Sequence, residues 1–266
     1  MDKVEKQFDE GVFSKAYIVD KKILLEAKTK DTFNSYKNFL GIIGLLKQKI
    51  TSVAIPYDSI KLINPCSKYP FGAMTYIMLK GTKLDISKCS SKGKDNIAKK
   101  LTLFLAEIHG VEVHKDKKMY IKLENKKINK NIILLKKYFT TKEILHIKKL
   151  QGKYNTFLKE RVFCTIHGDL YQENILVNKK QELASIIDFG SMTYLVPEYD
   201  FACIYKMDKQ IFATVLKNYH KKISLEGIKL CLYFKSIKFF EHVKNWSERA
   251  ILEEVKGIHE DIFNNN

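Results

Sequence analysis

HGDLYQEN, at residues 167–174, and DFG, at residues 188–190, are the two segments that decide the fold of this chain. Together they supply three oxygen-bearing side chains, Asp169, Asn174 and Asp188. Carboxylate and amide oxygens are the ligands that hard cations such as magnesium prefer, and a carboxylate can also orient a hydroxyl and accept its proton. The segments therefore predict a site in which these three side chains converge.

The residues that separate the two segments predict a β-hairpin. Two short apolar runs rich in β-branched residues, 175–177 and 184–187, flank a polar stretch at 178–182. Such a hairpin returns Asp188 to the side of Asn174. Phosphoryl transfer from ATP needs a proton acceptor and magnesium ligands grouped in this way, so the spacing favours that chemistry.

Residues 164–202 resemble the aminoglycoside phosphotransferase family, whose relatives include choline kinases and other small-molecule kinases of protein-kinase-like fold. The family pattern is a His-Gly-Asp, an Asn shortly after it, an Asp-Phe-Gly-like turn and a later Asp ahead of a small residue. The resemblance implies a role for each polar residue of the pattern. These are Asp169 as catalytic base, Asn174 and Asp188 as magnesium ligands, and His167 and Asp200 as residues that brace the catalytic loop.

The same resemblance implies an α+β, two-lobed protein-kinase-like fold. Residues 1–79 would form a small N-terminal lobe whose antiparallel sheet covers the nucleotide, and residues 80–266 a larger, mainly helical lobe for catalysis and acceptor binding. Apolar residues at helical spacing support the second lobe. The segments with this spacing are 97–109, 141–159, 202–219, 225–245 and 247–262.

Four residues of the first lobe and its end are candidates for nucleotide binding. Gly11 lies in a strand-turn-strand pattern where it lets the backbone approach phosphates, and Ser14 offers a donor beside it. By resemblance to the hinge of the family, the backbone near Met78 and Leu79 would bond the adenine. An ordinary hairpin turn and a buried strand ending in a turn are the alternatives.

One expected residue is missing from the first lobe. Glu26 stands where the family has a lysine or arginine that pairs with the phosphates, and Lys28, on the same side of an extended strand, is the candidate replacement. The helix expected over residues 32–50 contains no acidic partner for such a lysine. One hypothesis is a reversed ion pair between Glu26 and Lys37, and the alternative for the whole chain is a non-catalytic nucleotide-binding pseudokinase or scaffold.

Composition excludes several other classes. The net charge is +17, yet Arg161 and Arg249 are the only arginines, and recognition of phosphates and bases favours arginine. We therefore expect no nucleic-acid partner, and we interpret the densest basic tract, 115–137, as a solvated insertion between helices. The five scattered cysteines form no C-x-x-C pair, and no apolar run is long enough to cross a bilayer. A cytoplasmic protein without a membrane partner is expected.

The acceptor implied by the resemblance is a small molecule that bears a hydroxyl, of aminoglycoside, choline or amino-sugar type. An aromatic wall for an ammonium group could come from the last helices, although core packing explains most of these rings equally well. The rings are Tyr233, Phe234, Phe239, Phe240 and Trp246. Drug-modifying and housekeeping kinases both fit the pattern, with ATP or GTP as donor and with any oligomeric state.

Overall fold

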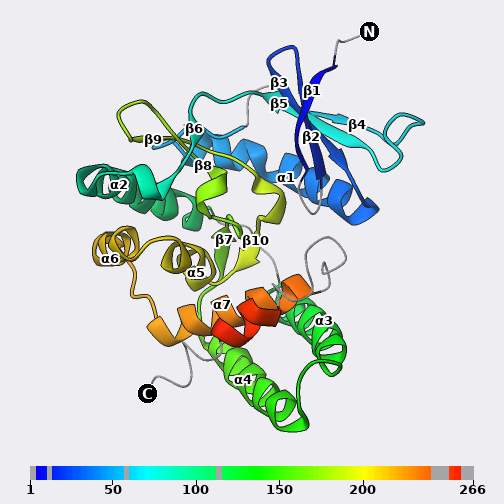
Figure 1. Cartoon of the computed structure of the whole chain (residues 1–266), viewed down its shortest axis with the longest axis vertical. Coiled ribbons are helices and arrows are strands. Elements are labelled where there is room, and N and C mark those ends of the chain that lie inside the picture. The colour runs from blue at the N-terminus through cyan, green and yellow to red at the C-terminus, as the bar shows by residue number, and fades with distance from the viewer. Residues whose placement is uncertain (1–3, 11–13, 57–59, 112–115, 241–251, 259–266) are drawn as a thin grey trace. The chain divides into compact units, whose positions relative to one another are not determined.

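The structure is a computed structural model that describes all residues except 1–3, 11–13, 57–59, 112–115, 241–251 and 259–266. The chain divides into two compact units. The first unit comprises Met1–Val111, His167–Thr193 and Met207–His220, and the second comprises Glu112–Ile166, Tyr194–Lys206 and Lys221–Asn266. An antiparallel sheet comes first and helices follow, as predicted (Figure 1). The lobe boundary between residues 79 and 80 remains a prediction.

The first unit begins with a five-stranded antiparallel sheet in the order β1-β2-β3-β5-β4. Its strands are β1 (Val4–Glu10), β2 (Ser14–Val19), β3 (Lys22–Ala27), β4 (Lys61–Ile63) and β5 (Ala73–Ile77). Asp20 and Lys21 both have positive φ, 48° and 61°, in the two-residue loop between β2 and β3. This backbone matches the twist of a tight hairpin and fixes the register of the two strands.

That register sorts the side chains onto two faces of the sheet, because paired residues share a face and neighbours in sequence alternate. Ser14 pairs with Ala27, and Ile23 pairs with Tyr76, which defines one face. Glu26 pairs with Lys15 on the other face, where the Tyr17 hydroxyl donates to its carboxylate over 3.0 Å. We call the first the α1 face and the second the far face.

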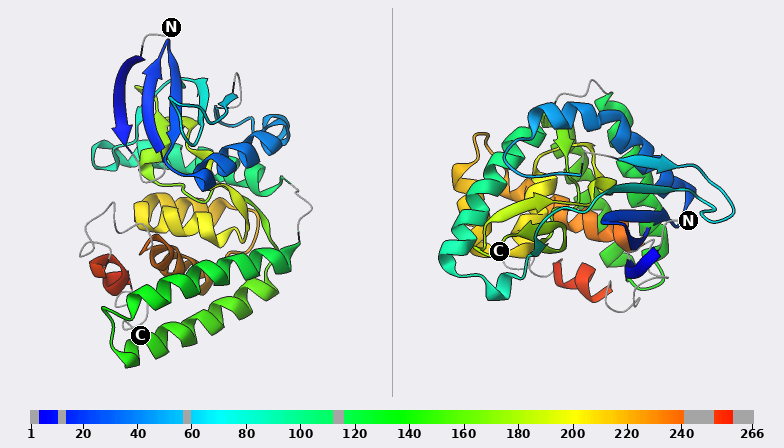
Figure 2. Two further views of the ribbon diagram at one scale, coloured as in Figure 1. Left: turned by 90° about the vertical axis from the view of Figure 1, so that its right-hand side faces the viewer. Right: turned by 90° about the horizontal axis from the view of Figure 1, so that it is seen from above.

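Helix α1 (Lys30–Lys49) contacts β3 and β5 within the first unit, and its place in the chain can be followed in Figure 2. Phe33, Tyr36 and Phe39 recur at helical spacing and are each 2% exposed. The Thr29 hydroxyl caps the helix by accepting a hydrogen bond from the Thr32 amide. The helix starts earlier than predicted and so includes Asp31 in its exposed first turn.

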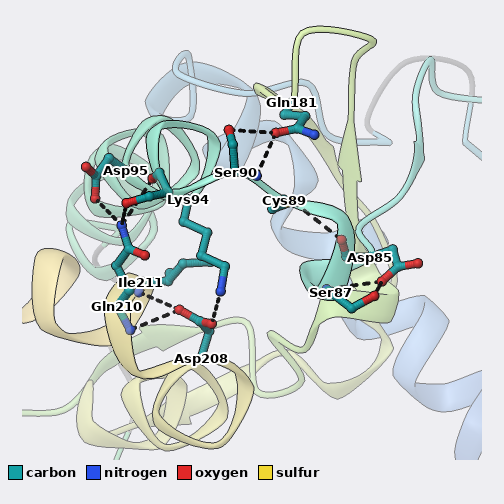
Figure 3. Close-up of polar contacts among 11 residues, drawn as sticks. Asp85, Ser87, Cys89, Ser90, Lys94, Asp95, Gln181, Asp208, Gln210 and Ile211 are labelled. Atoms are coloured by element: carbon teal, nitrogen blue, oxygen red, sulfur yellow. Dashed lines mark hydrogen bonds and ion pairs between the residues drawn. The ribbon is translucent and has the colours of Figure 1, made fainter.

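A second sheet of this unit, with three strands in the order β6-β8-β9, confirms the predicted hairpin. Its strands are β6 (Thr82–Lys83), β8 (Ile175–Val177) and β9 (Leu183–Ile186). The hairpin turn is held by Gln181, whose side-chain oxygen accepts from the Ser90 amide and hydroxyl, both at 3.1 Å (Figure 3). Ser90 caps helix α2 (Ser91–His109), so the turn is tied to the start of that helix.

Helix α6 (Lys209–Asn218) packs against α2, and the two are joined at one end by polar contacts (Figure 3). Lys94 pairs with Asp208 at 2.7 Å, and Asp208 caps α6 by accepting from the amides of Gln210 and Ile211. A single helix over 202–219 was therefore a wrong prediction. The chain breaks at Asp208 because its side chain starts a new helix there.

The second unit is mainly helical. Its elements are α3 (Lys117–Leu135), α4 (Thr141–Glu160), β7 (Cys164–Ile166), β10 (Thr193–Leu195), α5 (Glu198–Met207) and α7 (Leu225–Phe239). α3 and α4 lie side by side as a helical hairpin (Figure 2), and the turn between them ends in a capping box of Thr140 and Glu143. The interpretation of 115–137 as a solvated insertion is corrected, since most of that tract forms α3.

The end of the chain was predicted as helix over 225–245 and 247–262. α7 ends at Phe239, and residues 241–251 and 259–266 lie outside the described residues, together with Trp246. No helix in the described part of the chain combines the length and apolar character that a membrane span needs.

Candidate active site

Asp169 and Asn174 form the centre of the candidate site, in the loop and short 3₁₀ turn (Gln172–Asn174) that follow β7. The side-chain nitrogen of Asn174 donates to the Asp169 carboxylate over 2.9 Å and to the Asp169 carbonyl over 2.8 Å. Both hydrogens of the amide are used in this way, which leaves its oxygen as the group for a cation. The contact fixes the carboxylate and the amide relative to each other.

His167 is fully buried beneath this loop. The Asp169 amide donates to its Nδ1 over 3.2 Å, so Nδ1 carries no hydrogen, and Nε2 lies 3.0 Å from the Ile187 carbonyl, to which it donates. The ring is therefore a neutral imidazole with its proton on Nε2. It links the loop of Asp169 to the residue before Asp188.

Gly168 brings the loop against the turn that contains Asp188. Its φ is +82°, and a Cβ at this position would lie 2.4 Å from the Ser191 carbonyl oxygen. Both the left-handed backbone and the close approach require glycine. The sequence showed this residue only as part of the motif, and its packing role comes from the structure.

Asp188 is placed by the hairpin and by an unusual backbone. The Ile187 amide donates to the Asn174 carbonyl over 3.0 Å, which brings Asp188 beside Asn174 as predicted. Asp188 has φ 60° and ψ 65°, and its carboxylate accepts from the Gly190 amide over 3.2 Å. Aspartate is one of the few residues other than glycine that adopt this conformation readily, because its short side chain bonds the local backbone.

The ring of Phe189 anchors the turn formed by Phe189–Ser191. It stacks on Phe39 of α1, with centroids 5.4 Å apart, and meets the edges of His167 and Phe104 at 4.7 and 6.4 Å. Aromatic contacts of this geometry stabilise by roughly 0.5–1.5 kcal/mol beyond area burial. The positions of α1, α2 and the catalytic loop are therefore coupled through one side chain.

The oxygen donors at this site fit magnesium. Among the described residues, no three His, Cys, Asp or Glu side chains are grouped as a metal site. The predicted donor set consists instead of the Asp188 carboxylate and the Asn174 amide oxygen, with the Asp169 carboxylate beside Asn174. Magnesium in nucleotide sites typically takes only one or two carboxylates and completes its shell with phosphates and water, so this smaller set is sufficient.

The predicted nucleotide-binding residues fall in different places. Gly11 lies outside the described residues. Ser14 begins β2, and its hydroxyl is hydrogen-bonded to that of Tyr36. Lys28 follows the last residue of β3, in the bend before α1. The Met78 amide donates to the Lys21 carbonyl over 3.1 Å and is therefore already used. The predicted contact with adenine would have to use the Met78 carbonyl and the Leu79 amide.

The reversed ion pair is not found. Glu26 lies on the far face, bonded to Tyr17, while the Lys37 ammonium lies over the Phe33 ring, 4.8 Å from its centroid. No ion pair joins Glu26 and Lys37 in the structure, which describes both residues. The α1 face of the sheet, opposite Glu26, carries Tyr76 instead.

The second unit contains Asp200 and several of the predicted aromatic residues. Asp200 is fully buried on α5, and Tyr233 and Phe234 are fully buried on α7. Phe234 stacks on Tyr154 of α4 with centroids 4.9 Å apart. Tyr233 and Phe234 therefore belong to the core of this unit, in agreement with the packing alternative.

A comparison with protein families identifies the family of this chain. A model of the Phosphotransferase enzyme family matches residues 24–223. The chain belongs to this family, and the prediction of a phosphotransferase enzyme is confirmed. No curated protein sequence matches the chain.

Solved structures show the fold. The GDP and kanamycin complex of APH(2")-IIia matches with a TM-score of 0.79 and 20% identity, over 99% of this chain and 95% of that one. The GDP complex of wild-type aminoglycoside 2'-phosphotransferase-IIIa matches with a TM-score of 0.78 and 19% identity, over 99% and 94%. Macrolide 2'-phosphotransferase type I matches with a TM-score of 0.64 and 15% identity, over 94% and 88%. The two-lobed, kinase-like α+β fold is thereby confirmed.

Proposed function

We propose that this protein transfers the γ-phosphate of ATP, with magnesium, to a hydroxyl of a small molecule of aminoglycoside, choline or amino-sugar type. The observation that carries the proposal is the bond of the Asn174 amide to the Asp169 carboxylate, beside a hairpin that returns Asp188 to Asn174. Family membership supports the reaction class, and the nucleotide and kanamycin complexes of the similar structures support the type of substrate.

In this mechanism Asp169 orients the acceptor hydroxyl and accepts its proton as the oxygen attacks the γ-phosphorus. Asn174 keeps the carboxylate in place through its side-chain nitrogen and offers its oxygen to the cation. Asp188 would offer its carboxylate to the same cation. Magnesium, when bound, neutralises phosphate charge.

The remaining assignments belong to the same proposal. Ser14, Lys28 and the backbone of Met78 and Leu79 would bind the nucleotide, as would Gly11. His167 and Asp200 would support the catalytic loop. We expect a cytoplasmic protein whose partner is the small-molecule acceptor, with neither nucleic acid nor membrane involved.

A second candidate, a nucleotide-binding scaffold without catalysis, is motivated by Glu26 and by the absence of an acid in α1 beyond its first turn. Such a protein would bind nucleotide without turnover. The intact set of Asp169, Asn174 and Asp188 favours the enzyme, because a scaffold needs no proton acceptor.

The test is release of ADP from Mg-ATP by the purified protein, across aminoglycosides, choline, ethanolamine and amino sugars. Asp169→Asn should lower acceptor-stimulated turnover by roughly 10²- to 10⁴-fold. The matched control is Asp20→Asn, the same chemical change at an exposed turn residue whose φ of 48° asparagine also tolerates. Nucleotide binding without turnover for every acceptor would establish the scaffold, and absence of nucleotide binding would contradict both candidates.

A further inference from the structure

Strand β9, which leads to Asp188, is bordered by different segments on its two edges. β8 pairs with one edge, within the three-stranded sheet. On the other edge, Ala54 forms an isolated parallel bridge with Ser185. The Ala54 amide donates to the Ala184 carbonyl over 3.1 Å, and the Ile186 amide donates to the Ala54 carbonyl over 3.0 Å. The segment around Ala54 therefore borders the strand that carries the candidate magnesium ligand to its place.

That segment is held in turn by Glu107 of α2. The Glu107 carboxylate accepts hydrogen bonds from the Thr51 hydroxyl over 2.9 Å and from the Ser52 hydroxyl over 2.6 Å. It also accepts from the Ser52 amide, which lies 3.2 Å from both carboxylate oxygens. Thr51 and Ser52 come directly after Ile50, the C-cap of α1. One side chain of α2 thus fixes the chain between the end of α1 and Ala54.

Glu107 lies on a face of α2 that bonds to the same region at other points. Lys100, Phe104 and Glu107 are spaced at helical intervals and share this face. The Lys100 ammonium donates to the Leu183 carbonyl, at the start of β9, over 3.1 Å. The Phe104 ring meets the edge of the Phe189 ring, with centroids 6.4 Å apart. This face of α2 therefore holds the start of β9, the turn of Phe189 and the connection after α1.

We propose that Glu107 is a positioning residue for Asp188: it holds residues 51–54 against β9 and so fixes the strand that leads to Asp188. The inference rests on the proposed function, because the binding of magnesium by Asp188 belongs to that proposal. Loss of the Glu107 carboxylate should release residues 51–54 and loosen the outer edge of β9. The magnesium concentration that catalysis requires should then rise, whereas the KM for the acceptor should stay the same.

The first measurement is amide hydrogen exchange in the full chain, which reports on the bridge without any catalysis. The quantity is the exchange rate of the Ile186 amide relative to that of Ile187, whose amide bonds to the Asn174 carbonyl instead. In Glu107→Ala this ratio should rise about tenfold, the effect of losing roughly one hydrogen bond to a charged group. Glu107→Gln keeps a side-chain oxygen for Ser52 and should remain close to wild type.

The second measurement is the magnesium concentration that gives half-maximal ADP release. Glu107→Ala should raise it by about three- to tenfold at an unchanged acceptor KM, and Glu107→Gln should restore most of the wild-type value. Ser52→Ala should act in the same direction. Ser52→Ala combined with Glu107→Ala should show no more than the effect of Glu107→Ala alone, because both act through the same bonds.

The matched control for lost stability is Asp208→Ala. It removes the cap of α6 and the ion pair with Lys94, near the opposite end of α2 from Glu107. This variant should lower Tm at least as much as Glu107→Ala. It should leave the exchange ratio of Ile186 to Ile187 and the magnesium requirement unchanged, which separates positioning from a general loss of stability.

Three results would overturn the inference: an unchanged exchange ratio in Glu107→Ala, a raised ratio with an unchanged magnesium requirement, or equal effects in Asp208→Ala. If Glu107→Ala does not fold, Ser52→Ala decides by the same two measurements, since Ser52 is only half-buried. Failure of the proposed function is recognised separately. Wild type itself then releases no ADP with any acceptor, and the positioning role fails with it even if the exchange ratio rises.

Discussion

Polar residues of the catalytic loop in the first unit bond to residues close in sequence, whereas those of the helices in the second unit bond to residues far away in sequence. Asn174 reaches Asp169 across 5 positions of sequence, and His167 reaches Ile187 across 20. In the second unit, Arg161 binds Glu198 across 37 positions, and Lys238 binds Glu124 across 114. The site is built from local bonds within one motif, whereas the helices are joined by ion pairs between distant segments, each with at least one largely buried partner.

This difference separates activity from stability. Local bonds in the loop hold the Asp169 carboxylate, the proposed proton acceptor, and contribute modestly to the free energy of unfolding. An ion pair removed from water contributes little net stability when intact, but removal of one partner leaves the other charge poorly compensated and destabilises the fold. Variants of the two regions should accordingly separate into those that lose turnover and those that unfold.

The largest effect on stability is expected for Glu198→Ala. Glu198 is fully buried and binds Arg161 and the Ser224 amide, so its loss leaves Arg161 without its carboxylate partner. We expect the free energy of unfolding to fall by about 3 kcal/mol, measured by urea denaturation. Arg161→Met combined with Glu198→Leu should recover much of this loss, and a double variant as unstable as the single one would contradict the account.

Next in size is Gly168→Ala, which should affect both properties. Left-handed backbone costs alanine about 1–2 kcal/mol, and the clash with the Ser191 carbonyl displaces the catalytic loop, so kcat should fall at least about tenfold. Gly152→Ala in α4 is the matched control. A Cβ there meets no atom within 4 Å, and the helix should gain about 0.5–1 kcal/mol. Equal unfolding energies for the two variants would refute the packing role of Gly168.

Asn174→Ala should show the local character of the site most directly. It removes both bonds to Asp169, so we expect kcat to fall by roughly 10- to 100-fold while the free energy of unfolding changes by about 1 kcal/mol or less. Steady-state kinetics beside urea denaturation measures the two effects. A loss of stability as large as that of Glu198→Ala would remove the distinction between the regions.

The smallest effect concerns pH. Burial lowers the pKa of Lys238 below its ordinary value of 10.5, although Glu124 at 2.6 Å opposes the shift. Between the lowered pKa and 10.5 the unfolded chain binds more protons than the folded one. The free energy of unfolding should therefore rise with pH across this window, by at most about 1.4 kcal/mol per pH unit, and this gain is lost as pH falls. Glu124→Gln combined with Lys238→Met should remove this contribution to the slope of the free energy of unfolding against pH, measured between pH 8 and 10. An unchanged slope would show that Lys238 does not titrate in this range.

The contrast between local bonds and bonds across distant segments also explains which features could be predicted from the sequence. The hairpin and the grouping of Asp188 with Asn174 follow from spacing within one short segment, and the structure confirms both. The helix α3 was missed because its buried stripe includes Glu124 and Asn131, which break the apolar pattern. The break at Asp208 had a local signal, since aspartate before a helical run is a common N-cap.

Other features depend on contacts that no local pattern encodes. The placement of Glu26 on the far face follows from strand register, and the hydrogen bond between Tyr36 on α1 and Ser14 on β2 joins residues 22 positions apart. The ion pair of Arg161 with Glu198 joins residues that are adjacent only in the folded chain. The roles of Lys28, Leu79 and Asp200 remain predictions of the resemblance.

The left-handed backbone of Asp188 has a consequence for how this protein can lose its activity during evolution. Asparagine adopts the same conformation as readily as aspartate, so Asp188→Asn removes a charge from the site without straining the turn. One substitution therefore leads to a folded protein that lacks the carboxylate proposed to bind magnesium. The neighbouring Gly168 offers no such route, because every side chain there meets the Ser191 carbonyl. Decay of catalysis in descendants of this chain should begin at the aspartate and leave the glycine in place.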